Sequence, residues 1–71
     1  MAKIEKGTRV YFYSGICWAW GVVEHITTIN AKTKYLFPAS FKSGERVYEI
    51  RSEFNGHYYG DLHRSDITKV A

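Results

Sequence analysis

The sequence contains one cysteine, one proline and no long hydrophobic run, and these absences exclude several classes of protein. With Cys17 alone no internal disulfide can form, so the chain is not a disulfide-stapled secreted miniprotein. No run of about 18 apolar residues is present, and the segment 1–8 is charged without an apolar stretch. We therefore predict a cytoplasmic protein that does not enter the membrane.

The chain is short but rich in aromatic side chains. Its 71 residues suffice for one domain, 1–71, and include six Tyr, four Phe and two Trp. A domain of this size buries only about 60% of the surface that its unfolded chain exposes, so large rings are needed for the core. The polar tips of Tyr and Trp also make these rings ready contact groups at the surface.

The pattern of apolar residues predicts an all-β fold. Helical periodicity is poor, and short segments rich in Val, Ile and aromatic residues are separated by glycines. Gly21, inside the longest segment, predicts a sharp bend or the close approach of another backbone. The predicted strands are 8–13, 18–28, 34–37, 46–53, 57–62 and 67–70, the third extending a hairpin before Pro38.

Two short motifs predict how the last strands are connected. Asn55-Gly56 is a signal for a two-residue type I′ turn, which joins the strand ending at Glu53 to the next one. Arg64-Ser65-Asp66 predicts a single 3₁₀ turn before the closing strand. We expect a barrel of five to six bent antiparallel strands.

Several of these signals together resemble a known fold family. In order they are Lys6-Gly7-x-x-Val10, Gly15, Gly21-Val22-Val23, Tyr48-x-Ile50, Asn55-Gly56, Leu62 and Ile67-x-x-Val70. The pattern resembles the SH3-like barrels of Tudor and KOW modules, and is most similar to the small bacterial Tudor-like family called hypervirulence-associated. The resemblance implies a small SH3-like barrel with a long hairpin between its second and third strands.

An aromatic surface is the first candidate site. Its rings are Tyr11, Tyr13, Trp18 or Trp20, and Tyr58 or Tyr59, and we expect alternation to place one of each neighbouring pair outside. The resemblance implies a cage, formed where the first loop meets the third, that holds methylated Lys or Arg by cation–π attraction. Glu24 and Asp61 are the acidic residues expected near it. Stacking of nucleobases, docking of a peptide and completion of the core remain open alternatives.

A basic segment is the second candidate. No acidic residue occurs between Glu24 and Glu45, although the whole chain carries a net charge of +3. The segment offers Lys32, Lys34 and Lys42 as phosphate contacts and Tyr35, Phe37 or Phe41 as stacking groups. The alternative is a solvated loop whose lysines keep an exposed strand edge from pairing with another chain.

Metal binding and catalysis have weaker signals. The residues that could meet around a metal are Cys17, His25, His57, Asp61 and His63, but no pair has the close spacing of a zinc site. The serines lack a recognisable nucleophile motif, and no glycine loop is suited to a phosphate. We expect no metal, no cofactor and no enzymatic activity.

The sequence thus favours a non-enzymatic binding module. Its basic and aromatic face, which also includes Arg9, is predicted to contact nucleic acid or a nucleic-acid-associated complex. The alternative is a protein–protein interaction module, acting as a homo-oligomer, an adaptor or an inhibitor, that docks by an aromatic patch or a strand edge.

Overall fold

The computed structural model describes residues 4–71 and contains five strands and two 3₁₀ turns. In chain order they are β1 (Arg9–Tyr13), β2 (Trp18–Thr28), η1 (Lys34–Leu36), β3 (Arg46–Ser52), β4 (Tyr58–Leu62), η2 (Arg64–Asp66) and β5 (Ile67–Val70). The predicted all-β class is confirmed. Two 3₁₀ turns are present where one was predicted.

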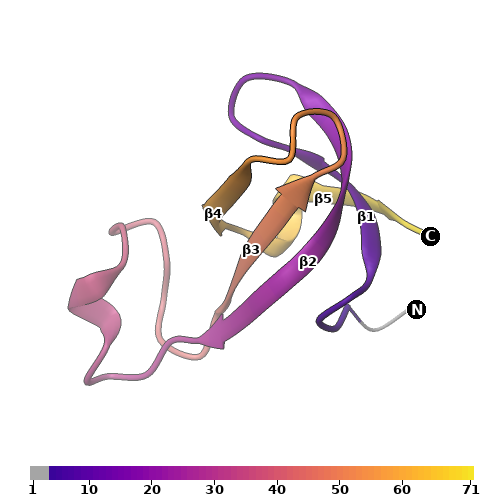
Figure 1. Ribbon diagram of the computed structural model, residues 1–71. Coiled ribbons are helices and arrows are strands. Elements are labelled where there is room, and N and C mark those ends of the chain that lie inside the picture. Colours follow the sequence, from indigo (N-terminus) through magenta and orange to yellow (C-terminus); the bar gives the residue numbers. More distant parts are fainter. Residues whose placement is uncertain (1–3) are drawn as a thin grey trace.

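The five strands form one antiparallel sheet in the order β4-β3-β2-β1-β5. β1 to β4 are neighbours in sequence order, and β5 returns to pair with β1 at the opposite edge. The long β2 runs through the middle of the sheet, from the β1–β2 loop at one end to the segment 29–45 at the other (Figure 1). β2 therefore separates two different ends of the molecule.

The core receives side chains from every strand. The main buried cluster comprises Ile4, Val10, Phe12, Val23, Tyr48, Ile50, Leu62 and Ile67. Because residues from both edge strands meet in one cluster, the sheet curls around its own inner face. A smaller cluster joins Ile29 and Phe41 of the segment 29–45 to Val47 of β3.

Gly21 allows a close approach of the neighbouring strands, as its position in the sequence predicted. A Cβ atom at this position would lie 2.6 Å from the backbone oxygen of Arg51, 2.7 Å from Ile50 Cγ2 and 2.8 Å from Phe12 Cε1. These contacts come from the neighbouring strands β1 and β3, so the absence of a side chain lets β2 lie close to both.

The predicted strand 34–37 is wrong, because the segment 29–45 turns instead of extending the hairpin. The Oδ1 atom of Asn30 accepts hydrogen bonds from the backbone N–H groups of Lys32 and Thr33, at 2.9 and 3.0 Å. Such side-chain bonds compete with strand pairing. The chain then forms η1, and no strand occurs in this described segment.

The predicted two-residue turn at Asn55-Gly56 is also wrong. A type I′ turn needs positive φ at both central residues, but only Gly56 has it, with φ 72°. Side chains stabilise a wider loop over 53–57: Ser52 Oγ accepts from the Phe54 N–H at 3.2 Å, and Asn55 Oδ1 accepts from the His57 N–H at 3.0 Å. This longer loop presents Phe54 to solvent.

The predicted turn at Arg64–Asp66 is confirmed as η2, and the residue before it anchors the segment 29–45. His63 Nδ1 lies 2.8 Å from Glu45 Oε2, and His63 Nε2 lies 3.1 Å from Ser40 Oγ. The Phe41 ring stacks on the imidazole, with ring centroids 3.7 Å apart. His63 thereby joins both ends of residues 40–45 to the sheet.

This anchor predicts a dependence of stability on acid pH. The hydrogen bond from His63, then that from the Lys42 backbone, lowers the pKa of Glu45 below its ordinary value of 4.5. The unfolded chain therefore binds the proton more readily, so the contribution of Glu45 is present above pH 4.5 and is lost as the pH falls through the folded-state pKa. In urea unfolding, wild type should be more stable than Glu45→Gln at pH 6, and the difference should shrink toward pH 3. An equal difference at both pH values would contradict this role.

A candidate binding groove between the first and third loops

A groove of about 420 Å³ lies between the first loop, residues 14–17, and the third loop, residues 53–57. The two loops lie side by side at the top of the molecule (Figure 1). The residues that line the groove are Tyr11, Cys17, Trp18, Ala19, Trp20, Glu53 and Phe54. All but Glu53 are apolar or aromatic, so the groove is suited to an apolar or planar group.

The rings of the groove are placed by the register of β1 on β2. Tyr11 pairs with Trp20 and Tyr13 pairs with Trp18 across the two strands. The Tyr11 and Trp18 rings are stacked, with centroids 5.7 Å apart and an angle of 11°, while Tyr13 lies tilted 5.2 Å from Trp18. The four rings form a continuous row, with Tyr11 also 5.3 Å from Trp20.

Both tryptophans lie on the outer face, which corrects the expectation that only one of them would. Trp18 and Trp20 are two positions apart, and a strand places residues two apart on the same side. Alternation does hold for the adjacent pair in β4. Tyr58 is 60% exposed, whereas Tyr59 packs against the core, 6.0 Å from the Phe12 ring.

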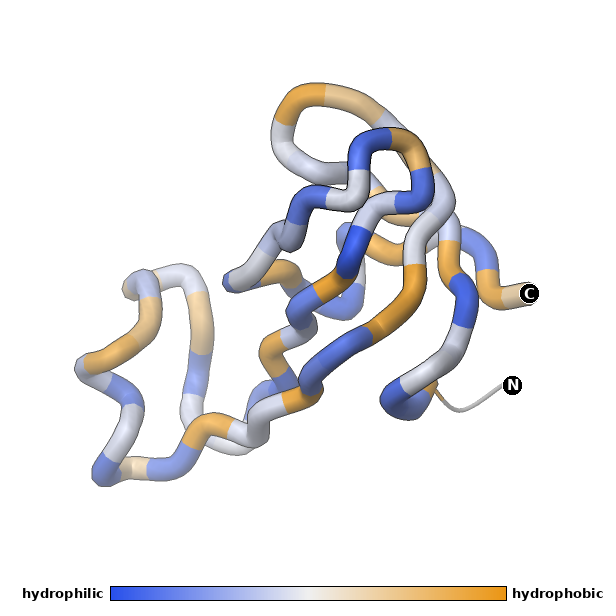
Figure 2. The backbone as a smooth tube through the Cα atoms, viewed as in Figure 1, coloured by the Kyte–Doolittle hydropathy of each residue, from blue (hydrophilic) through white to orange (hydrophobic). Residues whose placement is uncertain are grey.

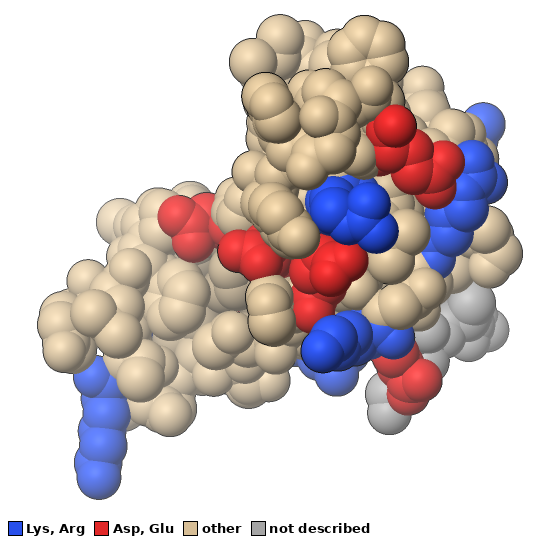
Figure 3. Space-filling view, viewed as in Figure 1, with Lys and Arg blue, Asp and Glu red and all other residues tan. Residues whose placement is uncertain are grey.

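Exposed apolar side chains surround the groove. Ile16 in the first loop is 83% exposed, Phe54 in the third loop is 84% exposed, and Trp18 at the start of β2 is 46% exposed. The tube of Figure 2 is orange, the hydrophobic colour, along parts of both loops. On the face shown in Figure 3 the upper tip of the molecule carries no Lys, Arg, Asp or Glu. Apolar surface gathered in this way is typical of a binding site.

The groove-lining Glu53 forms an ion pair with Arg9. Arg9 Nε donates to Glu53 Oε2 at 2.7 Å and Arg9 Nη2 donates to Glu53 Oε1 at 3.1 Å, while Arg9 Cζ lies 4.2 Å from the centroid of the Trp20 ring. The hydrogen bond from Arg9 holds the pKa of Glu53 below its ordinary value, and the same bond raises the pKa of Arg9. Both groups therefore stay charged at neutral pH.

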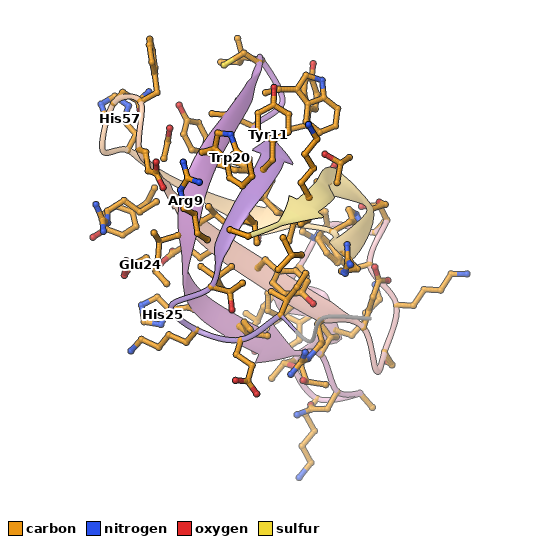
Figure 4. All side chains as sticks on the ribbon, turned by 90° about the vertical axis from the view of Figure 1, so that its right-hand side faces the viewer. Arg9, Tyr11, Trp20, Glu24, His25 and His57 are labelled. Carbon is orange, nitrogen blue, oxygen red and sulfur yellow. The ribbon has the colours of Figure 1, made fainter. Side chains whose placement is uncertain are left out.

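The acidic residue beside the rings is thus Glu53, and neither Glu24 nor Asp61 takes this place. The Glu24 carboxylate pairs with Arg51, at 3.3 Å, and Glu24 lies nearer the lower end of the molecule than the labelled Arg9 and Trp20 (Figure 4). Asp61 instead borders a second hollow, which is lined by β2, β3, β4 and Phe37. Glu53 could not be identified from the sequence, because its position depends on how β3 pairs with β2.

Two sets of hydrogen bonds hold the groove walls in place. The Glu53 N–H donates to the Trp20 carbonyl at 2.9 Å, which ties the third loop to β2. In the first loop, Ser14 Oγ accepts hydrogen bonds from the N–H groups of Ile16 and Cys17, at 3.4 and 3.2 Å. The rings of β1 and β2 therefore lie between two loops that have local support of their own.

No protein-family model, curated protein or solved structure matches this chain. Among the described residues 4–71, no helix is long and apolar enough to cross a membrane. The same residues contain no group of three or more His, Cys, Asp and Glu side chains placed to hold a metal ion.

The candidate metal ligands are in fact distributed over the molecule. Cys17 lines the groove, and His57 lies in the third loop. His25 lies 3.7 Å from Glu49 on the neighbouring strand, and His63 pairs with Glu45.

Of the predicted basic and aromatic face, Arg9 lies beside the rings, whereas the residues of the segment 29–45 lie apart from them. Lys32, Lys34, Tyr35 and Lys42 belong to the segment 29–45, which extends from the far end of β2 (Figure 1). Tyr35 is 81% exposed, but Phe41 is buried, so it is unavailable for stacking a base. The cations that do border the rings are Arg9 and Lys69, whose Nζ lies 5.3 Å from the Tyr11 centroid.

Proposed function

We propose that this chain is a non-enzymatic binding module that docks a protein partner in the groove between its first and third loops. The observation that carries the proposal is the exposed apolar surface of the groove at Trp18 and Phe54, to which exposed Ile16, next to groove-lining Cys17 in the chain, adds. Aromatic anchors in an apolar pocket, bordered by polar groups, are characteristic of protein interfaces. Glu53 and Arg9 supply the polar border here.

The fold supports an SH3-like barrel as the finer description of this module. Its strand order places β5 beside β1, and a 3₁₀ turn, η2, precedes β5, as in the barrels that the sequence resembles. The groove also lies where the first loop meets the third, the position of the ring cluster in Tudor-like modules. The exposed free thiol of Cys17 is consistent with a reducing compartment, so we place the protein in the cytoplasm.

A single-stranded nucleic acid is the second candidate ligand. The specific observation in its favour is that Arg9 and Lys69 lie over rings of the row, at Trp20 and Tyr11. Cations beside exposed rings can contact phosphates while bases stack. Glu53 counts against this ligand, because its charge neutralises Arg9 and repels phosphate.

Photo-crosslinking in cells distinguishes these ligands. p-Benzoyl-phenylalanine would replace Phe54 in one variant and Tyr35 in a control, two aromatic positions of nearly equal exposure, 84% and 81%. We expect a discrete adduct from position 54, removed by protease and resistant to nuclease, and none from position 35. An adduct of twice the 8.2 kDa chain mass would identify a second copy as the partner. A nuclease-sensitive adduct would favour nucleic acid, and absence of any adduct at position 54 would contradict the proposal.

A further inference from the structure

Arg9 is held in the way that proteins hold a guanidinium ligand. Its Cζ lies 4.2 Å from the Trp20 ring centroid, and two of its nitrogens donate to the two oxygens of Glu53, at 2.7 and 3.1 Å. The ring supplies a cation–π contact, and the carboxylate supplies a bidentate partner. The planar fork of arginine satisfies both oxygens at once, which the single ammonium of lysine does not.

The three residues of this arrangement come from three separate parts of the fold. Arg9 lies in β1, Trp20 in β2 and Glu53 in the third loop, 44 positions from Arg9. Figure 4 shows the labelled Arg9 and Trp20 side by side on the same surface. Trp20 and Glu53 also line the groove, whereas Arg9 is not one of the groove-lining residues. The two residues that hold the guanidinium group, Trp20 and Glu53, therefore belong to the groove.

The ion pair between Arg9 and Glu53 is accessible to solvent, so another cation can take the place of Arg9. The side chains of Arg9 and Glu53 are 47% and 40% exposed. Exposed ion pairs are weak, because water competes for both charges. A second guanidinium arriving from the groove side could therefore replace Arg9 without unfolding the sheet.

We propose that Trp20 and Glu53 form a guanidinium-binding site, that Arg9 occupies this site as an internal ligand, and that an arginine side chain of the protein partner displaces it. The choice of partner rests on the proposed function, whereas the site itself depends only on these three residues. The carboxylate of Glu53 beside the Trp20 ring favours a cation over an anion. When Arg9 is displaced, both carboxylate oxygens can accept hydrogen bonds, which favours a guanidinium over an ammonium group. Arg9 then lowers the apparent affinity for the partner's arginine by competing with it.

The test uses N-acetyl-argininamide as the probe and the two indole N–H signals of the ¹⁵N-labelled full chain as the readout. Arg9→Ala removes the internal ligand, so this variant should bind the probe at least about threefold more tightly than wild type, through the Trp20 signal. Arg9→Ala/Glu53→Gln should lose this gain, and N-acetyl-lysinamide should bind Arg9→Ala more weakly than the arginine probe. Equal binding to wild type and Arg9→Ala would overturn the proposal, as would an unchanged gain in the double variant.

Arg9→Met is the second variant if Arg9→Ala does not fold, because its apolar stem can still cover Trp20. It should also bind the probe more tightly than wild type, and no gain there would overturn the internal-ligand proposal. No partner takes part in these titrations. A negative crosslinking result therefore leaves the guanidinium site standing, and a negative titration leaves the groove standing as a docking site.

Discussion

Gly21→Ala is expected to destabilise the domain by about 2–3 kcal/mol. The added methyl carbon would lie 2.6 Å from the Arg51 carbonyl oxygen, a backbone atom of the neighbouring strand. This oxygen cannot move away freely, because β2 and β3 pair on both sides of the contact, at Gly21 with Ser52 and at Val22 with Arg51. Gly21 does not have a positive φ, so the loss of stability is steric in origin.

The effect is large for a chain of this size. A domain of 71 residues has a free energy of unfolding of about 4–10 kcal/mol, so the substitution removes a substantial part of it. In thermal unfolding, Tm should fall by about 10–20 °C. Gly60→Ala is the matched control, because a Cβ atom at this strand glycine meets nothing within 4 Å. Similar Tm values for the two variants would show that the close approach at Gly21 is not tightly packed.

Trp18→Ala is expected to weaken binding of the crosslinked partner by about 30-fold or more. Trp18 lies between two other rings of the row: it is stacked on Tyr11 and contacts Tyr13. It also lines the groove and remains 46% exposed, so its truncation removes contact area without opening the core. Titration calorimetry with the purified partner measures the change.

The control for this prediction is Tyr35→Ala, which removes an exposed ring from the segment 29–45. It should leave the dissociation constant within about twofold of wild type. The circular dichroism spectra of both variants should match that of wild type, because neither side chain belongs to the buried clusters. A loss of affinity in Tyr35→Ala that equals the loss in Trp18→Ala would place the binding surface elsewhere.

Local chemistry explains which parts of the fold could be predicted from the sequence. Gly21 and the turn at Arg64–Asp66 follow from the residues at those positions, and the structure has both. The error at 34–37 has an equally local cause: the apolar run Tyr35-Leu36-Phe37 suggested a strand, but the side chain of Asn30 had already turned the chain. Asn55 likewise supports a wider loop through its own side chain.

The groove was only half predictable. Tyr11, Tyr13 and the two tryptophans were identified as candidates from their residue types, although only one tryptophan was expected on the outer face. Glu53 and Phe54 were missed because they reach the rings through the pairing of β3 with β2 and the width of the third loop. The lysines of the segment 29–45 were grouped with the rings because distance along the chain does not show that β2 separates them.

We propose that recognition takes place in the groove and not on the lysine-bearing segment 29–45. Both tryptophans of the chain line the groove, so their indole N–H signals report on this site directly. The decisive measurement is a titration of the ¹⁵N-labelled protein with the crosslinked partner. We predict that both indole signals shift or broaden while the backbone amides of residues 31–36 keep their positions. Movement of those amides with unchanged indole signals would contradict the account.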